Sequence, residues 1–272
     1  AYVSEVDYEV SRDTGRPVPC LLVNDVRRAL GLLADAAYDH PSGRVKVCAF
    51  TGTKGKTTSA YYLKSVLDAH ARLVGGRTAG LFSSIEFDDG ENRGVSKLTT
   101  PEAFVLEQQL ANAAASGMEH VVMEASSQAL KYQRVENLPF DVACFLNIGR
   151  DHISPIEHPT FEDYFESKLR IFDQAKTAVV NLGTDEVDRV LDAASTAERL
   201  VTVGVEHPEA SLWASDIRMV GFNIEFNLHG LSADEPEAGE KVLLGIAGDF
   251  NVENALVAIA AAREIGIGID AI

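Results

Sequence analysis

The sequence contains little cysteine and no long apolar run, and each scarcity excludes a class of protein. Its three cysteines, Cys20, Cys48 and Cys144, are odd in number and far apart, which favours a reduced, cytosolic protein over disulfides or a Cys/His metal site. Cys48 and Cys144 lie in apolar runs that indicate buried strands, where cysteine is a small apolar side chain. No uninterrupted apolar stretch of about 18 residues is present, and residues 1–10 carry acids where a signal peptide would be basic and then apolar. The sequence therefore gives no indication of export or of a membrane span.

Basic residues are also scarce, because 24 Lys and Arg stand against 41 Asp and Glu and leave a formal net charge of −17. Proteins that bind nucleic acid neutralise phosphates with a basic face, so general nucleic-acid binding is not expected. A polyanionic ligand would have to be held locally, which makes the few basic residues inside motifs informative. The 46% hydrophobic content, in contrast, supports a sizeable core.

A break near residue 44 divides the sequence into two parts. Residues 25–38 place apolar side chains on one helical face, and a turn-forming segment follows at residues 40–43. Because the chain also begins without Met, we predict that residues 1–44 are the remnant of a longer N-terminal domain and that residues 45–272 form the main domain.

Beyond residue 44, short apolar runs alternate with amphipathic helical patterns. This alternation predicts the α/β class, with a mainly parallel sheet flanked by helices, because parallel strands need crossover connections. The expected buried strands are Val45–Phe50, His120–Met123, Val142–Leu146 and Ala178–Val180. Near residues 200–246 the connections become short, including the acidic turn Ser232–Glu240, and we predict a small antiparallel β-sheet there. Its strands would be Val201–Val203, Ile217–Val220, Phe222–Leu228 and Lys241–Ile246, followed by a last helix at Val252–Ile265.

A glycine-rich segment lies between the first of these strands and a helical pattern. It reads Thr51-Gly52-Thr53-Lys54-Gly55-Lys56-Thr57-Thr58, and a strand before and a helix after are the setting that a phosphate-binding loop requires. Glycines let backbone N–H groups approach phosphate oxygens, and the helix N-terminus adds partial positive charge. We predict that Gly52 to Thr58 bind a nucleotide, with Lys56 on the β- and γ-phosphates and the Thr57 hydroxyl on Mg²⁺.

Two other strand ends carry polar side chains that suit a metal site. Glu124 follows one predicted strand directly, and Asp151 and His152 come a few residues after another. Ligands gather at the carboxyl ends of strands in open α/β sheets, and carboxylate oxygen suits a Mg²⁺ ion that bridges phosphates. Glu124 is therefore a predicted Mg²⁺ ligand, with a helix-capping acid as the alternative, whereas a histidine such as His152, taken alone, is more often an ordinary loop residue.

A lysine lies on the apolar stripe of the next predicted helix. Phe161, Phe165 and Phe172 recur there at helical spacing. Lys168 falls on the same stripe, so its side chain is expected to point toward the core. Snorkelling of the ammonium group to solvent is the usual explanation for such a lysine.

These motifs together resemble the Mur ligase family, in which the phosphate loop reads Thr-Gly-Thr-x-Gly-Lys-Thr-Thr. The general phosphate-loop pattern has a further glycine where this sequence has Phe50, and the family commonly has Asn where this sequence has Lys54. The element from Asn147 to His152 is similar to the family's Asn-x-x-x-Asp-His, whose His binds the second magnesium. The resemblance also implies that Lys168 is the lysine modified to a carbamate, whose anionic group positions metal beside the γ-phosphate.

Four positions resemble the precursor-binding residues of the subfamily that adds the third residue of the stem peptide. They are Thr99, Thr100, Ser126 and Arg134. The two threonines belong to a Thr-Thr-Pro loop, and Arg134 could pair bidentately with a carboxylate or phosphate of the precursor. A solvated surface cation is the alternative for Arg134. The sequence departs from the subfamily at Gln128, where His is usual, and at Tyr132, where Gln is frequent.

The segment Gly248–Ala255 is similar to the family's Gly-x-Phe-Asn-x-x-Asn-Ala element. The resemblance implies that Asn251 and Asn254 lie beside the adenine end of ATP, a task that suits amides because they donate and accept hydrogen bonds at once. Asn251 could equally be the N-cap of the last helix.

The resemblance spans roughly residues 45–272, with five motifs in family order, and is greatest to UDP-N-acetylmuramoyl-dipeptide ligases. It implies a cytoplasmic, ATP- and Mg²⁺-dependent enzyme of peptidoglycan synthesis. Lys56, Lys168 and His152 would be catalytic while the precursor's carboxylate becomes an acyl phosphate, which the amino group of the incoming amino acid then attacks. The implied partners are the UDP-muramyl peptide, the amino acid and ATP, and a monomer is the expected state. The domain that binds the amino acid would follow Ile272.

Two other interpretations stay open at this point. Another ligase of the superfamily, such as a folylpolyglutamate synthetase or a different Mur step, would share the ATP chemistry but not the acceptor. A nucleotide-binding module without ligase activity would bind ATP and show no acceptor-dependent hydrolysis. The identity of the added amino acid is also left open.

Overall fold

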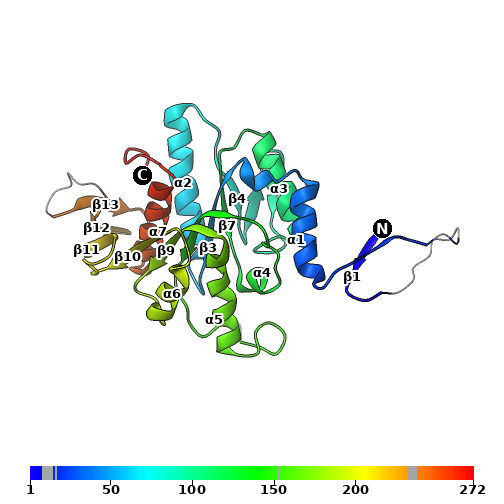
Figure 1. The fold of residues 1–272 in the computed structure, drawn as a ribbon. Coiled ribbons are helices and arrows are strands. Elements are labelled where there is room, and N and C mark those ends of the chain that lie inside the picture. The colour runs from blue at the N-terminus through cyan, green and yellow to red at the C-terminus, as the bar shows by residue number, and fades with distance from the viewer. Residues whose placement is uncertain (8–14, 16, 152, 232–237) are drawn as a thin grey trace.

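A twisted β-sheet runs through the middle of the molecule and carries helices on both faces (Figure 1). The computed structural model describes all residues except 8–14, 16, 152 and 232–237. The strands of this sheet are β3 (Lys46–Thr51), β4 (Gly80–Phe82), β5 (Glu86–Asp88), β6 (Arg93–Val95), β7 (His120–Glu124), β8 (Phe140–Phe145), β9 (Ala175–Asn181), β10 (Arg199–Val205), β11 (Leu212–Val220), β12 (Asn223–His229) and β13 (Glu240–Leu244). Their order is β13-β12-β11-β10-β9-β8-β3-β7-β4-β5-β6. Every pair between β11 and β4 in this order is parallel, which confirms the α/β class with a mainly parallel sheet.

The inner strands are apolar throughout because both faces of the sheet are covered. In β3, Cys48 and Phe50 pack into one hydrophobic core, and Val47 and Ala49 pack into another on the opposite face. The first core includes side chains of α2 (Lys56–Val74) and α7 (Phe250–Glu264). The second includes side chains of α3 (Ala103–Ala115), α4 (Ser127–Lys131), α5 (Phe161–Leu169) and α6 (Val187–Ala194). Helices on opposite faces can therefore both reach the end of β3.

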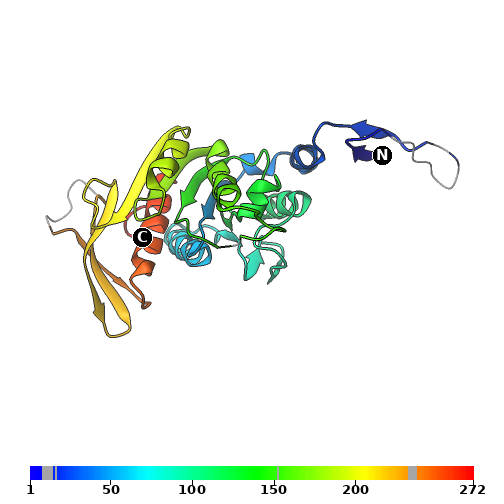
Figure 2. The same ribbon diagram turned by 90° about the horizontal axis from the view of Figure 1, so that it is seen from below.

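The antiparallel part predicted near residues 200–246 is present, but it is not a separate sheet. Strands β11, β12 and β13 pair antiparallel and continue the main sheet, and Figure 2 shows the long β11–β12 hairpin extending from one end of the molecule. Strand β10, which contains the predicted strand Val201–Val203, instead pairs in parallel with β9. The reason is that α6 provides a crossover between them. Of the predicted acidic turn, residues 232–237 lie outside the described residues.

The N-terminal segment places a helix against the main body and two short strands beyond it. Helix α1 (Val26–Ala37) agrees with the predicted helical stretch, and the Asp25 side chain caps it by accepting from the N–H groups of Arg27 and Arg28. Strands β1 (Tyr2–Ser4) and β2 (Cys20–Leu22) pair in parallel on the far side of α1 from the sheet (Figure 1). A domain boundary at residue 44 stays a prediction.

Helix α5 is shorter than the aromatic stripe predicts. It ends at Leu169, and Phe172 lies in the following 3₁₀ helix, η2 (Arg170–Gln174), where it still stacks on Phe145 with 6.1 Å between ring centroids. Lys168 is only 1% exposed, so its side chain points into the core as predicted and does not snorkel. None of the helices in the described part of the chain is both long enough and apolar enough to cross a membrane.

One buried carboxyl lies where α3 packs near α1. Glu107 is 3% exposed, and the nearby Asp35 is held by the ring of His40 and the amide of Asn137, each with 2.7 Å to Asp35 Oδ2. Burial raises the pKa of Glu107 to about 7, with the negative charge of Asp35 acting in the same direction and His40 opposing both. The folded protein therefore holds a proton on Glu107 at pH values where the unfolded chain does not.

We predict that replacing this carboxyl makes the stability less dependent on pH. The raised pKa means that the protonated Glu107 is stabilising below its ordinary value of 4.5 and that this contribution is lost as the pH rises through 7. Glu107→Gln should therefore increase the free energy of unfolding by about 1–3 kcal/mol at pH 8 and by progressively less toward pH 5, as measured by urea denaturation. The exposed Glu91→Gln serves as the control. An equal effect of Glu107→Gln at both pH values would contradict the assignment.

Candidate active site

A loop crosses the carboxyl end of the sheet between β3 and α2. Gly55, at the N-terminus of α2, adopts φ +85°, and its α-carbon faces the side chain of Asn254, which would lie 2.2 Å from an added Cβ. Gly52 approaches the start of the next loop so closely that a Cβ there would meet Leu146 Cβ at 2.9 Å. Neighbouring protein atoms leave no room for a side chain at either place, so both glycines are required by the packing of the loop itself.

Asn147, which the sequence motif contained but the predicted site did not, fastens this loop to the end of β8. Its side-chain oxygen accepts from Lys54 N–H at 2.9 Å, its amide donates to Lys54 O at 3.2 Å, and its backbone oxygen accepts from Thr53 N–H at 3.0 Å. The Thr53 hydroxyl in turn accepts from Gly149 N–H at 2.9 Å. The loop is thus held in shape by the neighbouring strand end.

Two amines meet at one carbonyl oxygen of the loop. Lys56 Nζ donates to Gly52 O at 2.8 Å, and Lys168 Nζ donates to the same oxygen at 2.7 Å. Burial lowers the pKa of Lys168 well below its ordinary value, the charge of Lys56 lowers it further, and Asp151 acts in the opposite direction. Burial also lowers the pKa of Lys56, partly offset by Glu124 and Asp151. The charges of these two amines are only partly balanced by Glu124 and Asp151. Their position at a glycine-rich loop therefore suits an anion such as a terminal phosphate.

The Glu124 carboxylate, whose charge acts on Lys56, accepts hydrogen bonds from neighbouring hydroxyl and N–H groups. Its Oε1 accepts from the Thr57 hydroxyl and from Ser84 N–H, both at 2.8 Å, and from the Ser84 hydroxyl at 3.2 Å. Carboxylate and hydroxyl oxygens are the donors that Mg²⁺ prefers, and this ion needs only one or two protein ligands when phosphates and water supply the others. The donor set therefore fits magnesium, although no three His, Cys, Asp or Glu side chains gather as a metal cluster within the described residues. His152 lies outside the described residues.

A pocket of about 290 Å³ opens beside Lys56 and Lys168, and we call it the acceptor pocket because three of the predicted precursor-binding residues line it. Thr99, Ser126 and Arg134 line it together with Lys56 and Lys168, so three of the four predicted precursor-binding residues come together. Lys97, Ser127, Gln128 and Tyr164 also line the pocket, although the sequence did not single them out as site residues.

Thr100 does not lie where a precursor-binding residue is expected, and Arg134 does not fit the alternative of a solvated surface cation. Thr100 is fully buried, and its hydroxyl donates to Glu124 O at 2.8 Å and accepts from Ser126 N–H at 3.0 Å, so it shapes the loop and does not face the pocket. Arg134 is not a solvated cation, because its side chain is 15% exposed and pairs with Glu102 at 2.9 Å.

A larger cavity of about 880 Å³ lies along the phosphate loop on the side of α7. Lys54, Gly55, Thr58 and Asn254, which belong to the predicted nucleotide site, line it, and so does Phe250, an exposed aromatic that the prediction omitted. Asn251 lies behind these residues. It is 3% exposed, donates to Ala247 O at 2.7 Å and contacts Asn254.

The alternative role for Asn251 is wrong, because the N-cap of α7 is Asp249. Asn251 lies inside the first turn of the helix, where its amide donates four residues back along the chain to the oxygen of Ala247. A buried amide at this place orients Asn254, which is the asparagine that reaches the cavity.

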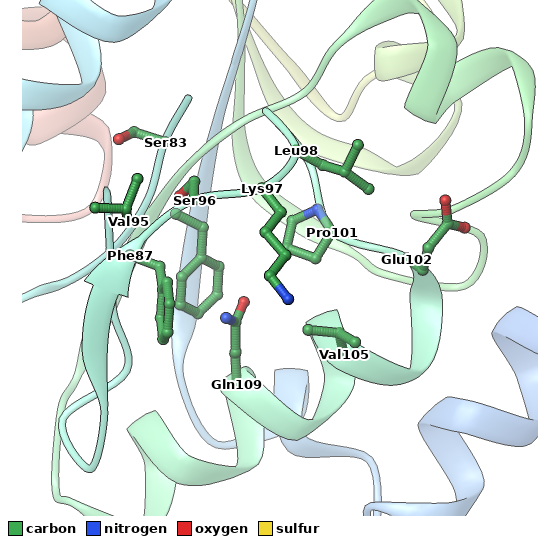
Figure 3. Close-up of a pocket in the computed structure, with 11 residues that line it drawn as sticks. Ser83, Phe87, Val95, Ser96, Lys97, Leu98, Pro101, Glu102, Val105 and Gln109 are labelled. Carbon is green, nitrogen blue, oxygen red and sulfur yellow. The ribbon is translucent and has the colours of Figure 1, made fainter. Parts of the chain in front are cut away.

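A side pocket of about 320 Å³ lies next to residues 96–102, the segment between β6 and α3 that we call the acceptor loop (Figure 3). Phe87 and Val95 of the β5–β6 hairpin form one wall, Val105 and Gln109 of α3 form the other, and the Lys97 side chain points between them (Figure 3). Lys97 borders the acceptor pocket as well, so the acceptor loop separates two hollows.

The fold and this strand–loop–helix site define the class of protein: an α/β protein of the phosphate-loop type with a second pocket beside the loop. Within that class, a family model described as the Mur ligase middle domain matches residues 50–262. The chain belongs to the Mur ligase family.

Similar proteins carry related names. The UDP-N-acetylmuramyl-tripeptide synthetase of Bifidobacterium longum is 40% identical over 99% of the chain and 51% of that protein. A solved UDP-N-acetylmuramoyl-L-alanyl-D-glutamate–2,6-diaminopimelate ligase superposes with a TM-score of 0.79 at 24% identity, over 99% of the chain and 52% of that structure. The MurF ligase from Thermotoga maritima in complex with ADP has a TM-score of 0.62 at 18% identity, over 99% of the chain and 55% of that structure. The chain spans about half the length of the curated relatives it matches.

We predict that a methyl group at Gly55 damages both the loop and nucleotide binding. Gly55→Ala combines strain at φ +85° with a clash against the Asn254 side chain. It should lower the free energy of unfolding by about 1–3 kcal/mol and weaken binding of a fluorescent ATP analogue about tenfold or more. Gly43→Ala is the control, since no atom lies within 4 Å of the place that its added methyl group would occupy. Unchanged affinity in Gly55→Ala would count against the loop as the nucleotide site.

Proposed function

We propose that the complete protein is a cytoplasmic ATP- and Mg²⁺-dependent ligase that adds the third amino acid to UDP-N-acetylmuramoyl-dipeptide in peptidoglycan synthesis. The observation that carries this proposal is the meeting of Lys56 and Lys168 at Gly52 O, because that point borders both the phosphate loop and the acceptor pocket. A phosphoryl group that passes from nucleotide to acceptor would pass these two amines.

The proposed chemistry needs little covalent help from the protein. The acceptor's carboxylate oxygen attacks the γ-phosphorus of ATP, ADP leaves, and the resulting acyl phosphate is attacked by the amino group of the incoming amino acid with loss of phosphate. Lys56 would neutralise charge on the transferring group, and the backbone N–H groups at the start of α2 would hold the phosphates. The residues mainly position the reactants.

Magnesium would be held by Thr57 and Glu124, with His152 assigned to a second ion from the family motif. The hydroxyl of Thr57 and the carboxylate of Glu124 already lie 2.8 Å apart. The bound ions would neutralise phosphate charge, and the Ser84 N–H group would keep the Glu124 carboxylate in place through its 2.8 Å hydrogen bond.

Thr99, Ser126 and Arg134 would hold the acceptor. Arg134 pairs with Glu102, which is 62% exposed on its side chain, so this weak pair can be exchanged for a carboxylate or phosphate of the precursor. The similar protein of Bifidobacterium longum is named as a UDP-N-acetylmuramyl-tripeptide synthetase, which supports an acceptor of this type.

Lys168 would react with carbon dioxide to form a carbamate. A neutral amine is required for this attack, and the lowered pKa of Lys168, caused by burial and by Lys56, increases the neutral fraction. The nitrogen forms a bond to carbon, one proton is released, and the product is an anion that can pair with magnesium and with Lys56. Modification would also replace two adjacent cations by an ion pair.

We predict that Lys56→Ala abolishes acceptor-dependent phosphate release by the complete protein, because the developing charge on the γ-phosphate loses its cation. Release is measured with ATP, an amino acid and UDP-N-acetylmuramoyl-dipeptide, and a folate acceptor in place of the muramoyl precursor tests the related ligase. Near-normal turnover in Lys56→Ala would reject the role of the loop. Phosphate release only with the folate acceptor would reject the proposed acceptor.

A carbamate on Lys168 can be detected directly. With ¹³C-labelled bicarbonate, the wild-type protein should give a carbamate carbonyl signal in the ¹³C spectrum, and the signal should be absent from Lys168→Ala. Lys64→Ala is the control and should keep the signal, since the Lys64 side chain is 17% exposed, in contrast to the buried Lys168, and forms an ion pair with Asp68 at 2.9 Å. A signal that persists in Lys168→Ala would place the modification elsewhere.

A further inference from the structure

A chain of three polar side chains ends at the acceptor pocket. Ser127 Oγ lies 2.9 Å from His158 Nε2, and His158 Nδ1 lies 2.7 Å from Asp163 Oδ2. The histidine is fully buried, Ser127 is 7% exposed, and the edge of the Tyr164 ring contacts the imidazole with 5.1 Å between centroids. These residues come from α4, from the loop before α5, and from α5 itself, so tertiary structure alone brings them together.

The chemistry of the partners sets the direction of each hydrogen bond. Partial burial raises the pKa of Asp163, but hydrogen bonds from Lys131 and His158 outweigh it and leave the pKa below the ordinary value, so the side chain is a carboxylate and only accepts. His158 Nδ1 must therefore donate to it. Lys131 Nζ also donates to the same oxygen at 2.6 Å, so the imidazole shares this carboxylate with an ammonium group.

A neutral imidazole that donates from Nδ1 has a lone pair on Nε2. The Ser127 hydroxyl then donates its only hydrogen to Nε2, and its oxygen keeps two lone pairs. Because Ser127 lines the acceptor pocket, those lone pairs are what it presents to a ligand. The order of contacts is that of a hydrolase triad, but here Asp163 is shared with the ammonium group of Lys131.

We propose that Ser127 is a specificity residue that accepts a hydrogen bond from the peptide N–H of the acceptor, and that His158 is the positioning residue that keeps the serine oxygen an acceptor. This inference rests on the proposed function, since it assigns a contact to the dipeptide of the proposed precursor. Arg134 and Ser126 lie in the same pocket and would hold the carboxylate part of that molecule.

The test compares the amide acceptor with its depsipeptide, in which an ester oxygen replaces the N–H between the two amino acids. In the wild-type complete protein, the ester should raise the acceptor KM about five- to tenfold, with kcat and the KM of ATP changed less than about twofold. Ser127→Ala should raise the KM of the amide acceptor by the same factor and show no further rise with the ester. Equal penalties that do not multiply identify a single shared hydrogen bond.

Two variants of His158 test whether this residue orients the Ser127 hydroxyl or only fills space in the core. His158→Leu frees the serine hydroxyl to rotate and should reproduce the KM effect of Ser127→Ala. His158→Gln places an amide oxygen near the former Nε2 position and should restore the acceptor KM to within about twofold of wild type. His120→Gln is the control, because this 9% exposed histidine lies at the opposite end of β7 from the site and should leave the acceptor KM unchanged.

Three outcomes would overturn the inference. The first is multiplication of the Ser127→Ala and ester penalties, and the second is a His158→Gln variant as impaired as His158→Leu. The third is covalent labelling of Ser127 by a sulfonyl fluoride, which would make the serine an activated nucleophile. Absence of acceptor-dependent phosphate release in the wild type is a different result, because it rejects the proposed function before any variant is compared.

Discussion

Two lysine side chains from opposite faces of the sheet point at one backbone oxygen, and the rest of the site depends on this convergence of like charge. Lys56 begins α2 and Lys168 lies near the end of α5, and their amines donate to Gly52 O at 2.8 and 2.7 Å. Two buried ammonium groups so close together would repel each other and lose hydration, which favours the neutral form of Lys168 unless an anion joins them. A sheet covered on both sides supplies two rigid helices that reach over the end of the same strand.

Much of this site could be predicted from the sequence, because its parts are local. The loop at Gly52–Thr58, Glu124 at a strand end and Lys168 on an apolar stripe each follow from neighbours within one element. The parallel core of the sheet follows from runs of buried residues in the same way. The short edge strands β5 and β6, of three residues each, offer too few positions for a periodic pattern.

Other features depend on contacts between distant segments and had no local signal. Thr100 and Asn251 were assigned to ligands, yet both turn inward to support a neighbouring residue. The bond between Ser127 and His158 spans 31 residues of sequence, and neither residue stands out in its own segment. Strand β10 can pair in parallel with β9 because α6 forms the crossover between them. The short strand patterns near β10 gave no indication of this crossover. Such features require the tertiary structure.

The contact between Gly55 and Asn254 joins parts of the chain that are 199 positions apart, since the two residues stand at 55 and 254. The carboxamide fills the space where any side chain at residue 55 would lie, and its helix is packed on α2 in the same core. A displacement of α7 along its axis would therefore either open a gap under the loop or press on it. Helix α7 is thus part of the framework that keeps the glycine-rich loop in shape, although it lies at the other end of the sequence.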